Sequence, residues 1–251
     1  MEYKVGDLVR SKHQDEEIIF KIEKIENGEY YIKGLEYRLA ATASAEDLIH
    51  HDEETREDEY YKEAENYINL ERNNFFYLPG KILHIDGDKD YLARCMHFYK
   101  EAKLDVKGLY IDEKDIPKQI KQLINQYRPD ILVITGHDEF YDNHQYKNNS
   151  SFVNSVKKAR EMEKAQDKLI IIAGACQSNF IDLIKAGANF ASSPKGLNIH
   201  ALDPAIVATL VSFSSRNEDI DLLEILNKTK YRTDGMGGII TKGTMYVGYP
   251  K

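Results

Sequence analysis

The fold is decided by two apolar runs, DILVIT from Asp130 to Thr135 and LIIIA from Leu169 to Ala173. Both are rich in β-branched residues and lack the alternation of polar residues that marks a strand with one face in water. Bare runs of this kind are typical of parallel strands that helices cover on both faces. We therefore expect a doubly wound, mostly parallel α/β sheet flanked by helices.

Strand and helix patterns alternate on both sides of these runs, as a doubly wound sheet requires. A crossover between parallel strands needs a connection of a dozen or more residues, which the helices would supply. Further strands are predicted at 81–87, 108–112 and 188–193, helices at 91–102, 116–127, 181–186 and 204–213, and a hairpin-like pair of strands at 238–247.

The first part of the chain follows a different pattern, in which apolar and polar residues alternate with the period of a half-buried strand. The last such stretch contains Leu35, Tyr37 and Leu39. Asn27-Gly28 is a strong hairpin turn, because both residues tolerate positive φ. We expect this part to form a small SH3-like β-barrel.

Three segments follow from these patterns. Residues 1–50 make up the β module, and residues 79–251 make up the α/β domain. In the linker between them, residues 51–78, acidic residues greatly outnumber basic ones. Such a stretch has no core of its own and forms a solvated helix or a mobile linker.

Composition narrows the classes of function. The chain has 251 residues, of which 42% are hydrophobic and 30% are charged, as in ordinary globular proteins. Its net charge of -8 argues against nucleic-acid binding, which needs a basic face. No apolar run is long enough to span a membrane, and the N-terminus lacks the apolar core of a secretory signal, so we expect a cytoplasmic protein. The two cysteines, Cys95 and Cys176, lack the clustering of a zinc site.

The two apolar runs end in reactive groups. DILVIT leads into Gly136 and His137, and LIIIA leads into Gly174, Ala175 and Cys176. Sites in open α/β sheets gather beyond the carboxyl ends of the strands. If the two strands are neighbours, His137 and Cys176 therefore lie side by side, and the glycine before each lets a substrate approach the backbone closely.

This arrangement predicts a Cys–His nucleophile. Cys176 would open a helix, where free N–H groups and the helix dipole stabilise a thiolate and lower the pKa of the thiol. The thiolate would attack a carbonyl carbon and form an acyl-enzyme, with His137 as general acid and base. We expect Cys95, which falls on an apolar helical stripe, and His84, which lies inside a strand, to belong to the core.

Two alternatives stay open. Gly174-x-Cys176-x-Ser178 also resembles the nucleophile elbow of a Cys-dependent amidase, in which the catalytic His follows the nucleophile. The only downstream candidate is His200. In the caspase-like fold the His precedes the Cys from the adjacent strand, as His137 does, so the chain order favours that fold. The other alternative is a non-catalytic scaffold.

Several longer motifs resemble the YabG sporulation-specific protease family of endospore formers. They are LHIDGD at 83–88, RPDILVITGHD at 128–138, AGACQS at 173–178, AGANFASSP at 186–194 and NIHALDP at 198–204. The resemblance covers nearly the whole chain. It implies a cysteine endopeptidase that cleaves after arginine, processes spore coat and cortex-associated proteins, and needs no metal or organic cofactor. It also implies a location in the mother cell and on the spore surface.

The resemblance carries the catalytic roles onto His137 and Cys176. By analogy with caspase-like enzymes, the backbone N–H groups of Cys176 and Asp138 would bind the oxyanion. An enzyme specific for arginine would also be able to cleave its own linker after Arg56 or Arg72, because exposed charged segments are where proteases cut.

An arginine side chain at the residue before the cleaved bond (P1) needs a carboxylate for bidentate pairing. Asp86 and Asp88, at the end of the first strand of the α/β domain, are the leading candidates, because caspase-like enzymes set their P1 preference there. Asp203 is the third. An extended substrate can also add a strand to the sheet. The further candidates for substrate binding are Ser192, Ser193 and His200.

Overall fold

A computed structural model describes residues 3–15, 18–51, 60, 62–63, 76–137, 140–141, 145–146 and 148–249. In this part of the chain, the central sheet has six strands in the order β14-β13-β12-β9-β7-β8. The first five along the chain are parallel, and β14 runs antiparallel to β13. Their bounds are β7 Ile82–Asp86, β8 Val106–Tyr110, β9 Ile131–Thr135, β12 Ile170–Ala173, β13 Phe190–Ser192 and β14 Met236–Gly238.

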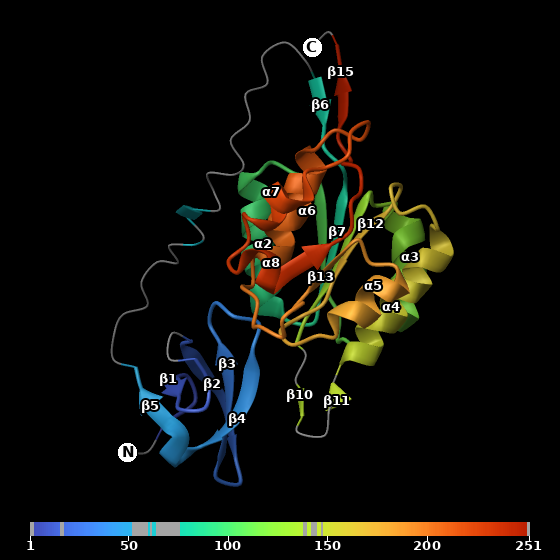
Figure 1. Cartoon of the computed structure of the whole chain (residues 1–251). Helices are drawn as coiled ribbons and strands as arrows, with labels where there is room; N and C mark the ends of the chain where they lie inside the picture. Colours follow the sequence, from blue (N-terminus) through green and yellow to red (C-terminus); the bar gives the residue numbers. More distant parts are fainter. Residues whose placement is uncertain are drawn as a thin grey trace.

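Helices cover both faces of this sheet, as predicted (Figure 1). Ile131 and Val133 pack into the core on one face, while Leu132 and Ile134 pack into the core on the other, which is why the whole run is apolar. One face carries α2 (Lys89–Glu101) and α6 (Asp203–Phe213), and the other carries α3 (Ile116–Tyr127), α4 (Asn149–Met162) and α5 (Phe180–Ala186). The short helices α7 (Leu222–Leu226) and α8 (Arg232–Gly235) follow α6.

The β module is a five-stranded antiparallel sheet in the part of the chain that the structure describes, with the order β4-β3-β2-β1-β5. Asn27 and Gly28 make the predicted turn, both with positive φ. The bounds are β1 Leu8–Ser11, β2 Phe20–Glu26, β3 Glu29–Gly34, β4 Ala40–Ser44 and β5 Leu48–His50, with a 3-10 turn at Ala45–Asp47. The module lies at the carboxyl edge of the large sheet (Figure 1), and its apolar core is continuous with the core under α2 and α6.

Two predicted elements were wrong. The segment Leu35–Leu39 is not a strand but a loop between β3 and β4 that reaches the α/β body. The pair predicted at 238–247 is not a hairpin, because β14 joins β13 in the large sheet. Residues 246–248, β15 (Tyr246–Gly248), instead pair with β6 (Phe76–Leu78).

Several further elements have no counterpart among those predicted. These are α4, α7, α8, β6 and the short paired strands β10 (Phe140–Tyr141) and β11 (Gln145–Tyr146). Among the residues described, no helix is both long and apolar enough to cross a membrane.

Candidate active site

Three strand ends meet at one edge of the sheet. β9 lies between β7 and β12, as the pairing of Ile134 with both Ile85 and Ala173 shows, so the condition that the two apolar strands are neighbours is met. Parallel strands present their carboxyl ends at the same edge. The segments that carry Asp86, His137 and Cys176 therefore leave the sheet side by side.

His137 is held at several points. Its backbone N–H donates to Glu113 Oε1 at 2.8 Å, and its carbonyl oxygen accepts a hydrogen bond from Asn148 Nδ2 at 2.8 Å. Its ring Nε2 lies 2.8 Å from Asp88 Oδ2. A carboxylate only accepts, so Nε2 carries the hydrogen and Nδ1 of the neutral ring keeps the lone pair. Nδ1 is buried and has no hydrogen-bond partner among the described residues.

Asp88 binds the imidazole of His137. One carboxylate oxygen accepts from His137 and from Lys33 Nζ at 2.7 Å, and the other caps α2 through the N–H groups of Asp90 and Tyr91. Burial would raise the pKa of Asp88, but the hydrogen bonds from His137 and Lys33 hold that pKa well below its usual range. Asp88 is therefore an ionised partner of His137, a contact that the sequence analysis did not foresee.

Cys176 lies in a tight turn just before α5. The helix begins at Phe180 with Asn179 as its N-cap, so the prediction that Cys176 opens the helix was wrong. Gly174, with φ +118°, allows the turn. Side-chain hydroxyls fix its backbone: Ala175 N–H donates to Ser178 Oγ at 2.9 Å, Gln177 N–H donates to Ser193 Oγ at 2.9 Å, and Ser192 Oγ donates to Ala175 O at 2.8 Å.

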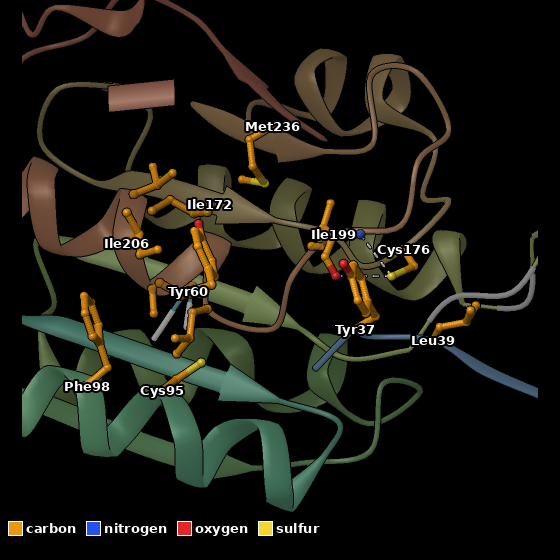
Figure 2. Close-up of a cluster of buried hydrophobic side chains, with 14 of the residues drawn as sticks. Tyr37, Leu39, Tyr60, Cys95, Phe98, Ile172, Cys176, Ile199, Ile206 and Met236 are labelled. Atoms are coloured by element: carbon orange, nitrogen blue, oxygen red, sulfur yellow. Dashed lines mark hydrogen bonds between the residues drawn. The ribbon is translucent and has the colours of Figure 1, made fainter. Parts of the chain in front are cut away.

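The thiol of Cys176 is fully buried. Its Sγ accepts the N–H of Ile199 at 3.3 Å and lies 3.7 Å from the carbonyl oxygen of the same residue (Figure 2). Burial raises the pKa of Cys176 to about 12, against the smaller effect of the Ile199 N–H. The predicted lowering of this pKa is therefore wrong for this conformation, because the chain itself excludes water from the sulfur.

An arginine from the β module fills the space next to Asp86. Arg38 Nη1 lies 2.5 Å from Asp86 Oδ2, and both side chains are fully buried. Its Nε and Nη2 donate to Ala201 O at 3.1 and 2.8 Å, and Nη2 lies 3.4 Å from Cys95 Sγ. The guanidinium carbon lies 5.2 Å from the centre of the Tyr91 ring. We call this set of contacts to Asp86, Tyr91, Cys95 and Ala201 the arginine site.

Asp86 is built to stay ionised. Thr135 Oγ1 donates to Oδ2 at 2.8 Å, and the N–H of Asp88 donates to Oδ1 at 2.9 Å. Burial would raise the pKa of Asp86, but the charge of Arg38 holds it well below its usual range. His84 and Cys95 are both buried, as predicted.

Asp203 has other partners. It accepts from Tyr60 OH at 2.6 Å, from Lys230 N–H at 2.9 Å and from His200 N–H at 3.0 Å. Burial raises its pKa. Among the three predicted carboxylates, the structure places Asp86 against an arginine, Asp88 against His137, and Asp203 beneath the His200 loop.

The remaining predicted residues are distributed around the nucleophile turn. Both sides of β13 are already paired, with β12 and β14, and the side chains of Ser192 and Ser193 bond to the turn or its neighbours. The segment 199–201 instead pairs with the loop between β3 and β4, through an isolated antiparallel bridge between Tyr37 and His200. Asp138 and the linker arginines, Arg56 and Arg72, lie outside the described residues.

No local pattern could have identified Arg38, because an arginine that alternates with Tyr37 and Leu39 is expected on the solvent-facing side of the predicted strand. Asp88 had a signal in its position at the start of α2, but that signal also fits an ordinary helix cap. Within the described ranges, no group of three or more His, Cys, Asp or Glu side chains is arranged to hold a metal ion.

A family model and a known protein both match this chain over nearly its full length, and both point to the same family. The model of the family described as YabG peptidase U57 matches residues 4–70 and 55–250. The sporulation-specific protease YabG of Bacillus subtilis (strain 168) is 37% identical to this chain over 288 aligned positions, which cover 100% of this chain and 99% of that protein.

Proposed function

This chain belongs to the YabG peptidase U57 family, and from that membership we propose that it is a cysteine endopeptidase of sporulation, with Cys176 as nucleophile and His137 as general acid and base. The observation that carries the proposal is the state of His137. Asp88 fixes its Nε2, while Nδ1 is buried and has no partner among the described residues, on the strand end next to that of Cys176.

The proposed reaction follows from this arrangement. The thiol proton of Cys176 passes to His137 Nδ1, and the thiolate attacks the carbonyl carbon of the substrate to form a thioester. The peptide C–N bond breaks as His137 returns the proton to the leaving amine, and His137 then activates a water that hydrolyses the thioester. The backbone N–H groups of Cys176 and Asp138 would bind the oxyanion.

The arginine site supports cleavage after arginine. Asp86 is buried and ionised, and Ala201 O accepts two further guanidinium N–H groups, so the site satisfies an arginine that enters it. A lysine would lose the fork of donors that both acceptors use. We assign Asp86, in place of Asp88 or Asp203, as the carboxylate that selects arginine.

The strand order supports a caspase-like fold. Numbered along the chain, the strands of the large sheet run second, first, third, fourth, fifth and sixth, with the last antiparallel. His137 follows the third and Cys176 the fourth. In the β module, the last strand returns beside the first, which suits an SH3-like barrel. The separate sheets suit a β module over residues 1–50 and an α/β domain over residues 79–251, although β6, at the end of the segment 51–78, pairs with β15 of that domain.

The amidase alternative is less well supported. Its base would be His200, whose Nδ1 accepts the N–H of Leu202 at 3.2 Å and whose ring packs against Tyr37 and Tyr60. These contacts give the imidazole of His200 a structural role in its own loop, and its Nδ1 is already used as an acceptor.

The name of the relative supports a role in sporulation. We propose that the substrates are spore coat and cortex-associated proteins with exposed arginines, and that the enzyme acts in the mother cell and at the spore surface. Self-cleavage after Arg56 or Arg72 is part of the same proposal.

Peptide reporters with Arg, Lys or Asp at P1 test this assignment. Cys176→Ala and His137→Ala should each lower cleavage of the Arg reporter on the order of 10³-fold or more, because nucleophile and base act as a unit. Circular dichroism should show both variants folded. The matched control is Cys95→Ala, which removes only a weak thiol contact of the arginine site and should keep most of the activity on the Arg reporter. Cleavage that survives in Cys176→Ala would refute the mechanism, and activity that depends on His200 but not on His137 would favour the amidase.

A further inference from the structure

We propose that residues 36–39 of the β module are a built-in pseudosubstrate, which fills the peptide-binding edge and the arginine site of its own chain. This inference rests on the proposed peptidase function and deepens it. It predicts that the enzyme is latent in this conformation, and that a protein substrate binds only after the β module has moved away.

The backbone of this segment binds as a peptide substrate would. Arg38 N–H donates to Ile199 O at 3.3 Å, and Ala201 N–H donates to Glu36 O at 2.9 Å, with Tyr37 opposite His200 between them. Together these contacts form an isolated antiparallel bridge with two backbone hydrogen bonds. Adding a strand to an exposed edge is the general way in which enzymes and binding domains hold an extended peptide.

The side chain of Arg38 is bound as a specificity residue would be. Its three nitrogens contact a buried carboxylate, a backbone carbonyl and a thiol, and its guanidinium faces the Tyr91 ring. Burying an arginine is costly unless charge and hydrogen bonds are both satisfied, so a site of this quality is built for a guanidinium. The same site would therefore receive the P1 arginine of a substrate.

The bound segment lies against the proposed nucleophile. Ile199 accepts the N–H of Arg38 and at the same time donates its own N–H to Cys176 Sγ. Tyr37 lies beside Ile199 and Cys176 in Figure 2. Burial raises the pKa of Cys176, while the N–H groups of Ile199 and Arg38 act in the opposite direction. In the sense of the proposed reaction, Arg38 occupies P1 and Leu39 occupies the first position after the cleaved bond.

The far side of the Arg38–Leu39 bond is held as firmly as the near side. Leu39 is buried, its N–H donates to Tyr37 O at 2.8 Å, and its carbonyl oxygen accepts from Gly34 N–H at 2.8 Å. The hydroxyl of Tyr91 lies within hydrogen-bond reach of the carbonyl oxygens of both Gly34 and Tyr37 and can donate its one hydrogen to either. An amine released from this bond would stay next to the acyl group and reform the bond, because proximity makes the reverse step effectively unimolecular. These contacts favour an inhibitor over a substrate.

A reagent that carries arginine and alkylates thiols, such as a peptidyl-arginine chloromethyl ketone, measures whether the site is open. Labelling of Cys176 in the full chain should be about 10-fold or more faster in Arg38→Ala than in the wild type, because an open state of about 10% or less limits the wild type. Lys24→Ala removes an exposed cation from the same module and should label at the wild-type rate. Equal rates in wild type and Arg38→Ala would overturn the pseudosubstrate.

A second measurement does not depend on catalysis. Agmatine, a small guanidinium compound, should raise the Tm of Arg38→Ala by about 5 °C at saturation and leave the wild type unchanged, because only the variant has an empty arginine site. Adding Asp86→Asn to Arg38→Ala should remove the shift. Absence of a shift in Arg38→Ala would overturn the inference.

The two proposals fail in different ways. If Cys176 is not labelled in any variant but agmatine binds to Arg38→Ala, the catalytic role of Cys176 is wrong and the occupied arginine site stands. If wild-type chain incubated alone is cut between Arg38 and Leu39, and Cys176→Ala is not, the peptidase function stands and the pseudosubstrate is overturned.

Discussion

Asp86 and Asp88 lie at the end of β7 and have different partners. Asp86 ends the strand and faces the core with Arg38, while Asp88 caps α2 and reaches His137. Lys33 of the β module also contacts Asp88, so both carboxylates are covered from the same side. We therefore assign Asp86 to the recognition of arginine and Asp88 to the orientation of His137.

Substitution by asparagine should separate these two roles. In the Arg38→Ala background, Asp88→Asn should lower kcat for an Arg reporter on the order of 10²- to 10⁴-fold with little change in KM, because it disturbs the tautomer and orientation of His137. Asp86→Asn should instead lower kcat/KM for Arg reporters about 100-fold and leave neutral reporters nearly unchanged. Steady-state kinetics with both reporters decide. Equal losses on both reporters for Asp86→Asn would contradict its assignment.

The nucleophile turn shows how an element is shaped by contacts with its neighbours. Gly174 has φ +118°, and a Cβ at this position would lie 2.2 Å from Ser192 Oγ. That hydroxyl, on β13, holds the carbonyl oxygen of Ala175. The position of Cys176 therefore depends on the absence of a side chain two residues before it.

Gly174→Ala should destabilise the protein by about 2–4 kcal/mol, which combines positive-φ strain with overpacking, and should lower activity by displacing Cys176. Gly6→Ala is the matched control, since Gly6 has φ +97° with no atom within 4 Å of the added Cβ. It should cost only about 1–2 kcal/mol and leave kcat unchanged. Urea unfolding and the Arg reporter test both variants. A fully active Gly174→Ala would contradict this account of the turn.

At the scale of the whole molecule, the β module and the α/β body share one core and one buried ion pair. The core extends from Phe20 and Ile32 in the module to Phe98 and Ile206 in the body. The Arg38–Asp86 pair crosses the same interface. Because the folded pKa of Asp86 lies below its unfolded value, the stabilisation is present above the unfolded pKa and is lost as pH falls through the folded one.

This linkage gives a test of the interface. Between pH 5 and about pH 8, wild type should be more stable than Asp86→Asn by about 3 kcal/mol, since the variant leaves a buried charge unpaired. Below about pH 4, where the unfolded carboxyl binds a proton, the difference in unfolding free energy should shrink. Urea unfolding over this pH range provides the measurement. A difference that stays constant down to pH 3, or that is absent at neutral pH, would show that Asp86 is not ionised against Arg38.

Most strands and helices of the large sheet, and the two strand ends that carry His137 and Cys176, could be predicted from the sequence. The helix at 116–127 has the bounds that its pattern predicted, and apart from the strand pair at 238–247 the other predicted strands and helices of the α/β body differ by a few residues at most. Apolar periodicity reports which faces of an element are buried, and that is local information. The rules of crossover connections limit the possible orders of parallel strands, and the structure then gives the actual order.

The pairing of charged side chains and the burial of Cys176 depend on the tertiary structure and could not be predicted from the sequence. Arg38 lies 48 residues from Asp86, and Asp88 lies 49 residues from His137. The hairpin predicted at 238–247 failed for the same reason, because β14 found its partner in β13. Local sequence patterns do not report which residues so far apart in the chain come into contact. Burial of Cys176 beneath the β module likewise reversed the predicted direction of its pKa, because desolvation depends on what packs against a group rather than on its neighbours in the chain.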